Sequence, residues 1–220
     1  LPPVETLTQY EAVRLFLEIT TALAGFALFG TTTSMIRYYP KFRTADGSLN
    51  GFTFWAYALA LGGFLIFLSL MLVLQDEFLR FMAVNSSLFN RYFPAILVMV
   101  LVIQLALVTD THNSLYGRIT VPNLIRENYY RLLMAGSALL FMAGWIGFDF
   151  VIWSLPLIYL SGLVINFIYL NSLRRVALRP EPAFLKANPE LMRDFRGFTY
   201  IWFLTSIGGE RYAGRVLARL

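Results

Sequence analysis

Five polar side chains interrupt stretches of the sequence that are otherwise apolar, and they are the first candidates for a binding function. Arg14 and Glu18 precede a long uncharged stretch that ends at Arg37, and Gln104 and Asn166 are single amides inside two later apolar stretches. A charge inside such a stretch is costly and is a functional candidate by default. We therefore take Arg37, Glu18, Arg14, Gln104 and Asn166 as the candidate substrate-binding residues.

Each of these residues also has a simpler structural interpretation. Arg14 and Glu18 are four residues apart, which is the spacing at which opposite charges pair on one helix face. Arg37 could anchor the end of a helix by extending its guanidinium into water. Gln104 and Asn166 could form hydrogen bonds between neighbouring helices. The sequence leaves both interpretations open for each residue.

The sequence offers little for catalysis. Its single histidine, His112, lies two residues after Asp110. The two residues could carry a proton, but the simpler interpretation is a solvated histidine in a loop. The chain contains no cysteine, no HExxH or GxSxG motif and no phosphate-binding glycine loop. We therefore expect a protein that is not an enzyme, with no catalytic residues, no metal ligands and no cofactor.

The composition is that of a membrane protein. Hydrophobic residues make up 58% of the chain and charged residues only 14%, whereas about a quarter of the residues in soluble domains are charged. The net charge of +5 comes largely from residues that flank the apolar stretches, so it predicts membrane orientation rather than nucleic-acid binding. The sequence therefore predicts an all-α, polytopic bundle of transmembrane helices.

The apolar stretches predict five membrane spans and part of a sixth. A bilayer core about 30 Å thick needs about 20 helical residues, and Pro40 should end the first helix near Tyr39. A helix over Leu132–Leu173 would be about 63 Å long, so the chain must turn back near Gly147. The prediction is a transmembrane lobe over residues 1–175 with helices at about 12–38, 51–75, 92–110, 131–148 and 151–173, a cytoplasmic linker over 176–196, and the truncated start of a further helix with its tail over 197–220.

Basic residues are concentrated on one side of the predicted bundle. The segments that follow the first, third and fifth spans share a side, and they contain most of the lysine and arginine, including Arg37, Lys41 and Arg118. This side is therefore predicted to be cytoplasmic, and the residues before the first span to be outside. Since the chain starts there with neither a signal peptide nor Met, we expect an internal fragment of a larger transporter-like protein that lacks one preceding span.

Two short motifs resemble the lipid-linked oligosaccharide flippases of the MATE/MOP superfamily, the O-antigen and polysaccharide type. Arg37-Tyr38-Tyr39-Pro40-Lys41-Phe42, after a stretch containing Gly30, is similar to the "RYFP"-like end of that family's second helix. The segment from Tyr116-Gly117-Arg118 to Arg131-Leu132-Leu133 looks like the family's basic connection between its fourth and fifth helices. The resemblance covers nearly all of the chain and implies one N-terminal lobe of a two-lobed transporter.

The resemblance implies a function in transport. Such a protein turns lipid-linked oligosaccharide across the bacterial inner (cytoplasmic) membrane by alternating access, for envelope or exopolysaccharide synthesis, with Arg37 drawing in the pyrophosphate head group. The implied partners are this substrate, membrane lipids and other membrane proteins of polysaccharide assembly, with no nucleic acid. Two alternatives remain open: an ion-coupled exporter of small molecules on the same fold, with Glu18 as its acidic residue, and a non-transporting accessory or acyltransferase-like protein of polysaccharide assembly.

Overall fold

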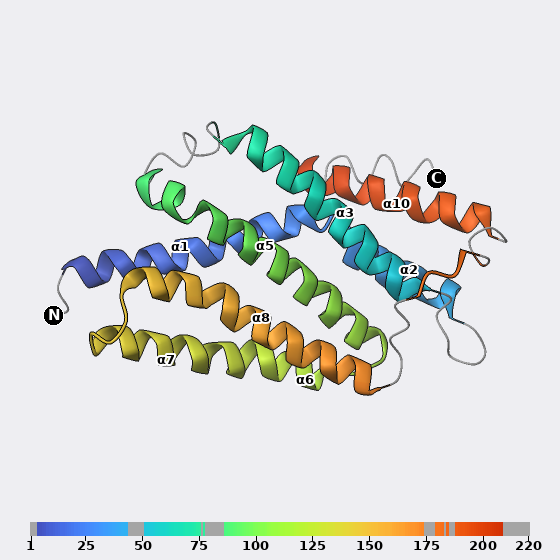
Figure 1. Ribbon diagram of the computed structural model, residues 1–220. Helices are drawn as coiled ribbons and strands as arrows, with labels where there is room; N and C mark the ends of the chain where they lie inside the picture. The colour runs from blue at the N-terminus through green and yellow to red at the C-terminus, as the bar shows by residue number, and fades with distance from the viewer. Residues whose placement is uncertain are drawn as a thin grey trace.

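Every regular element in the described part of the chain is helical (Figure 1). The computed structural model describes residues 4–43, 51–75, 77, 86–173, 179–182, 184 and 188–208. The helices are α1 (Val4–Ala27), α2 (Thr31–Phe42), α3 (Phe52–Val73), α5 (Ser86–Leu115), α6 (Thr120–Leu124), the π-helix η1 (Ile125–Tyr129), α7 (Tyr130–Met142), α8 (Phe148–Ser172) and α10 (Pro189–Gly208).

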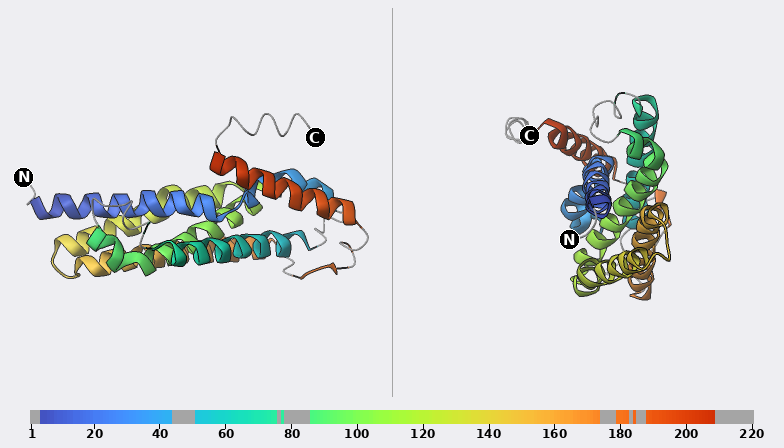
Figure 2. Two further views of the ribbon diagram at one scale, coloured as in Figure 1. Left: turned by 90° about the horizontal axis from the view of Figure 1, so that it is seen from above. Right: turned by 90° about the vertical axis from the view of Figure 1, so that its left-hand side faces the viewer.

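Helix α5 is at the centre of the bundle and contacts α1, α2, α3 and α8. It carries an apolar core against α1, α3 and α8, in which Ile96 and Met99 meet Phe16, Phe64 and Leu155. In a membrane, the close packing of such side chains stabilises the bundle through van der Waals contacts. The helices run roughly along one axis, as Figure 2 shows in two further views.

Contacts between residues near the helix termini define the two ends of the bundle. At one end, the rings of Tyr39 in α2 and Tyr116 after α5 lie 5.9 Å apart between their centroids. At the other end, Arg91 near the start of α5 forms an ion pair of 2.5 Å with Asp149 at the start of α8. The C-terminal ends of α2 and α5 therefore share one end, and the N-terminal ends of α5 and α8 share the other.

The structure supports a membrane protein with three or four candidate spans. Three helical segments are long and apolar enough to cross a bilayer (Phe52–Val73, Arg91–Leu115 and Phe148–Ser172), and the bent pair of α1 and α2 counts as a fourth if it is one span. Leu65 and Ile66 of α3 and Leu157 and Ile168 of α8 leave apolar surface exposed, as lipid contact requires. The fourth predicted span, at about 131–148, differs, because α7 has only 13 residues and follows charged residues in η1.

The first predicted helix is broken. An uninterrupted helix over 12–38 was expected, but α1 ends at Ala27, α2 begins at Thr31, and the two are bent by 44°. Phe29 and Gly30 have φ angles of 49° and 70°, which no right-handed helix allows and which glycine adopts at little cost. The Thr31 hydroxyl donates a hydrogen bond of 2.5 Å to the Leu28 carbonyl, which links the two sides of the break.

The sequence predicted that Pro40 ends the helix near Tyr39, but the structure differs. Helix α2 continues to Phe42 with Pro40 inside it. A proline removes one backbone donor, and here the helix ends within a few residues of it. The loss is therefore confined to the last turn, where the buried Phe42 ring packs against Phe52, with 5.1 Å between centroids.

The region predicted as a polar loop after residue 110 is largely helical. Helix α5 continues to Leu115, and α6, η1 and α7 follow with a short turn between. The polar residues Asp110 and Asn113 do not end α5, because their side chains form hydrogen bonds to α8. The chain then turns back between Met142 and Phe148, ahead of the turn predicted at Gly147–Asp149.

The predicted linker is shorter in the structure. Helix α10 begins at Pro189, inside the segment 176–196, and proline suits the first position of a helix. Phe195 and Phe198 of α10 are buried against Tyr38 of α2, with ring centroids 5.2 and 5.7 Å from that of Tyr38. Residues 174–178 and the predicted tail over 209–220 lie outside the described residues.

Candidate functional site

Arg37 lies on the exposed side of α2, over an aromatic ring of α10. Its guanidinium carbon is 4.1 Å from the centroid of Phe198 and 5.8 Å from that of Tyr38. One turn later, the Lys41 ammonium is 5.0 Å from the centroid of Tyr38. A cation over an aromatic face is held in position without losing its charge. Arg37 and Lys41 therefore present two positioned positive charges at this end of the bundle.

Helix α10 is joined to α2 beneath these charges. The hydroxyls of Ser34 and Thr199 form a buried hydrogen bond of 2.8 Å between the two helices. Phe195 adds an edge contact to Tyr38 and another to Phe42, with 6.2 Å between the Phe42 and Phe195 centroids. The aromatic surface that carries Arg37 and Lys41 is thus built by two helices far apart in the sequence.

Arg14 and Glu18 form an ion pair on the surface of α1. The Arg14 Nε and Glu18 Oε1 atoms are 2.8 Å apart, and their side chains are 70% and 58% exposed. The path along α1 and α2 from Arg14 to Arg37 is roughly 34 Å at the ordinary rise of a helix. The structure therefore does not bring these two candidates together with Arg37; it pairs them with each other.

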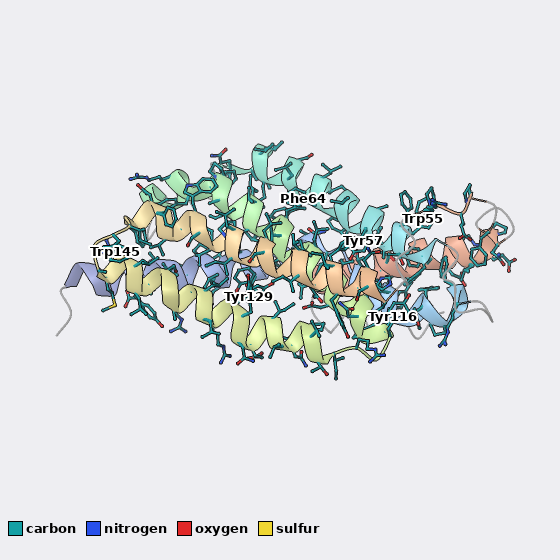
Figure 3. The ribbon with its side chains drawn as sticks, turned by 60° about the horizontal axis from the view of Figure 1, so that its bottom comes forward. Trp55, Tyr57, Phe64, Tyr116, Tyr129 and Trp145 are labelled. Atoms are coloured by element: carbon teal, nitrogen blue, oxygen red, sulfur yellow. The ribbon has the colours of Figure 1, made fainter. Side chains whose placement is uncertain are left out.

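The C-terminal half of α5 carries a strip of polar side chains that faces α3 on one side and α8 on the other. Toward α3, the hydroxyls of Tyr57 and Thr109 are 2.8 Å apart, and the buried Gln104 donates from Nε2 to the Ala60 carbonyl. Tyr57 and Tyr116 lie at the end of the bundle opposite Trp145 (Figure 3). The candidate Gln104 thus ties α5 to the backbone of α3.

Toward α8, two side chains of the strip are linked through one side chain of α8. Asn113 Nδ2 donates a hydrogen bond of 2.8 Å to Asn166 Oδ1, and Asn166 Nδ2 donates to Asp110 Oδ1. Asn113 and Asn166 are fully or almost fully buried, whereas Asp110 is partly exposed. Asn166 is therefore the link between a carboxylate and a second amide, and both of these come from α5.

His112 is not the solvated loop histidine that the sequence predicted. It lies inside α5 and is fully buried, because that helix extends beyond residue 110. Its Nε2 atom is 3.4 Å from both the Thr53 hydroxyl and the Tyr116 hydroxyl, while its Nδ1 atom has no partner. It points toward α3 and makes no hydrogen bond to Asp110 in the described part of the chain.

Buried polar atoms without a hydrogen-bond partner are concentrated on α5. In the portion of the chain that the structure describes, such side-chain atoms are Gln104 Oε1, His112 Nδ1 and Asn113 Oδ1 of α5, and Trp55 Nε1 of α3. Native proteins leave few buried polar groups unpaired, so each one needs an explanation. The strip on α5 is therefore the second candidate site, after the basic end of α2.

The break between α1 and α2 lies against α3. A Cβ atom added to Gly63 would be 2.5 Å from the Ala27 carbonyl oxygen and 3.0 Å from the Phe29 ring. Only glycine leaves room for so close an approach of two backbones. The angle between α1 and α2 is therefore supported from outside by α3.

Sequence reasoning missed Asn113, Thr53 and Tyr57 as members of a site, and it considered Asp110 only as a partner of His112. The signal was present, since Asp110 and Asn113 are three residues apart and so share a helix face. The prediction that the helix ended at residue 110 concealed this spacing. Among the residues that the structure describes, no group of three or more His, Asp or Glu side chains could hold a metal ion.

Comparison with known protein families, with curated proteins and with solved structures finds no match for this chain.

Proposed function

We propose that this chain is one lobe of a two-lobed transporter that flips lipid-linked oligosaccharide across a bacterial cytoplasmic membrane. The observation that carries the proposal is the pair of exposed cations, Arg37 and Lys41, which rest on aromatic rings at the end of a broken span. The motif that contains both residues is also the one that resembles the MATE/MOP flippases.

The charges suit the head group of such a substrate. A lipid-linked oligosaccharide carries a pyrophosphate, and the planar guanidinium of arginine matches phosphate oxygens in pairs. Arg37 lies at an end of the bundle, where a head group would be in water while its lipid tail remains in the bilayer. Arg118 and Arg126 are exposed near the same end, so under the positive-inside rule this end faces the cytoplasm.

The break at Leu28–Gly30 supports a transporter rather than a rigid anchor. Irregular backbone at membrane depth is tolerated where it is buried in protein or lines a cavity, and broken helices of this kind are frequent in transporters. Since α2 carries Arg37 and α1 does not, a change of the 44° angle between them would move the bound head group relative to the bundle. No covalent step is needed in such a cycle.

The proposal is tested by the fate of the substrate in cells that lack the protein. We expect lipid-linked oligosaccharide to accumulate in extracts of these cells, and a plasmid copy of the gene to restore its normal level. An exporter of small molecules would instead leave that level unchanged and raise the sensitivity of the cells to organic cations. An acyltransferase-like protein would leave the level unchanged and yield a glycan that lacks an acyl group.

A further inference from the structure

A groove lies between α7 and α8, in the half of the bundle that ends at Phe148. It encloses about 680 Å³, and small-molecule sites commonly have volumes of about 300–1,000 Å³. Its wall on α7 consists of residues that recur every three or four positions and therefore share one face of the helix. They are Leu133, Gly136, Ser137, Leu140 and Ala143.

The groove is closed at both ends by contacts between the same two helices. At its inner end, the ring of Tyr130 is packed directly on the backbone of Gly162, so closely that a Cβ atom there would overlap the ring. At its outer end, the ring centroids of Phe141 and Phe148 are 6.3 Å apart. The space between α7 and α8 is therefore a bounded site and not an open seam along the whole length of the helices.

The depth of the groove matches one leaflet of a bilayer. Ser154 and Ile158 form its wall on α8, and they lie about 9 and 15 Å along that helix from its start at Phe148. The hydrocarbon core of a bilayer is about 30 Å thick, and α8 is long and apolar enough to cross it. The groove therefore extends from one membrane surface to about the middle of the bilayer.

The wall of the groove is apolar in its chemistry as well as in its composition. The Ser137 hydroxyl donates a hydrogen bond of 2.8 Å to the Met134 carbonyl, and the Ser154 hydroxyl donates one of 2.7 Å to the Val151 carbonyl. Both serines therefore use their only hydrogen within their own helix. A water molecule needs about 2–4 polar partners, so the groove should exclude water and accept a hydrocarbon group.

One polar group lies at the outer end of the groove. Trp145 is part of the wall there, and its side chain is 79% exposed. Figure 3 shows it at one end of the bundle, with Tyr129 nearer the middle and Tyr116 at the opposite end. Tryptophan is enriched where a membrane meets water, because its ring is apolar and its N–H is a donor. The site therefore suits a ligand with a long apolar body and hydrogen-bond acceptors at one end.

We propose that this groove binds one acyl chain of a bilayer phospholipid, with the ester groups of the lipid beside Trp145 and the end of the chain near Ile158. Hydrocarbon is as apolar as leucine, so the chain is held by van der Waals contacts that an empty groove would lack. The site requires only that the protein lies in a membrane, and it does not depend on the proposed transport.

A neighbouring helix fits the groove less well than an acyl chain does. A helix is about 10–12 Å wide with its side chains and needs about 30 Å to cross the bilayer core. It would have to pass over the contact of Tyr130 with Gly162 and could not enter the bounded space beneath. An acyl chain is thinner and belongs to one leaflet, as the groove does.

Photo-crosslinking of the protein in phosphatidylcholine vesicles tests the site. Two phosphatidylcholine probes are used, one with a diazirine at the end of an acyl chain and one with a diazirine next to the ester. The chain-end probe should label α7 near Leu133 and α8 near Ile158, whereas the ester-side probe should label the chain near Trp145. Both probes should label the groove more strongly than the exposed apolar face of α3 at Leu65 and Ile66.

The variant G136L fills the groove. Nothing lies within 4 Å of a Cβ atom added at Gly136, so the protein should fold, which circular dichroism checks, and it should lose most of the labelling in the groove. The matched control A138L changes an exposed residue on the opposite side of α7 and should keep it. Added phosphatidylcholine should also raise the unfolding temperature in detergent more for the wild type and A138L than for G136L.

Four results would overturn the proposal. These are equal labelling of the groove in G136L and the wild type, equal labelling of the groove and of α3, and labelling by the two probes in the reverse order. The fourth is labelling that falls as the ratio of protein to lipid rises, since a second copy of the chain would then cover the groove.

Discussion

The guanidinium carbon of Arg37 lies 4.1 Å from the centroid of the Phe198 ring, so a cation at the end of α2 rests on a ring supplied by α10. This contact allows the two roles of Arg37, binding and helix docking, to be separated. R37A removes both the charge and the contact, whereas F198L removes the contact and keeps the charge.

We expect R37A to lower translocation of lipid-linked oligosaccharide by roughly tenfold or more, which is the size of a lost charge-assisted interaction. F198L should translocate at close to the wild-type rate, although it loses about 0.5–1 kcal/mol of stability with the cation–π contact. The measurement is the rate at which labelled glycan reaches the outer leaflet. Equal losses in R37A and F198L would show that Arg37 serves helix docking alone.

Gly63 should be irreplaceable at the break between α1 and α2. In G63A, the added methyl group would lie 2.5 Å from the backbone oxygen of Ala27, and overpacking of this kind costs about 1–3 kcal/mol. The adjacent G62A is the matched control, because nothing lies within 4 Å of its added Cβ. It should gain up to about 1 kcal/mol from the higher helix propensity of alanine. Thermal unfolding in detergent should therefore show shifts of opposite sign, and equal shifts would contradict the close approach of α1 and α3.

Gly162 of α8 is the second position where a methyl group does not fit. A Cβ atom there would overlap the Tyr130 ring, which stacks on Tyr159 with 4.3 Å between centroids. G162A should destabilise the protein by about 1–3 kcal/mol. In the double variant Y130L/G162A, the cost of G162A should fall by about 0.5–3 kcal/mol, because the two residues are in direct contact. Strictly additive losses in thermal unfolding would show that Tyr130 does not pack on Gly162.

The two buried amide candidates should differ in their effect on stability. Q104L loses a hydrogen bond to the Ala60 carbonyl but also removes an unpaired oxygen, so we expect a change within about 1 kcal/mol. N166L removes the partner of both Asp110 and Asn113 and should cost about 1–3 kcal/mol or more. Unfolding in detergent measures both variants. A larger loss in Q104L than in N166L would contradict the hydrogen-bond network between α5 and α8.

The sequence was sufficient for the helical class and for the long apolar helices, because an uncharged stretch of bilayer length has few other stable structures. It did not reveal the break at Phe29–Gly30. That break depends on the approach of α3 at Gly63, which is a contact between residues distant in the sequence. Local propensity carries no information of this kind.

Polar residues account for other differences between the predicted and the observed helices. Asp110 and Asn113 suggested the end of a helix, yet α5 continues through them because Asn166 of α8 supplies their partner. His112 is buried for the same reason. Prolines also misled the prediction, because Pro189 was taken as part of a linker and instead begins α10. For Asp110, Asn113 and His112 a tertiary contact decides the structure, and the local sequence alone does not show it.

The most direct test of the proposed function is the leaflet in which lipid-linked oligosaccharide resides as the protein is depleted from cells. The glycan is labelled from outside with a reagent that does not cross the membrane, and total glycan is measured after lysis. We expect the total to rise while the fraction labelled from outside falls, because the substrate remains in the cytoplasmic leaflet. An unchanged labelled fraction during complete depletion would contradict the proposed function.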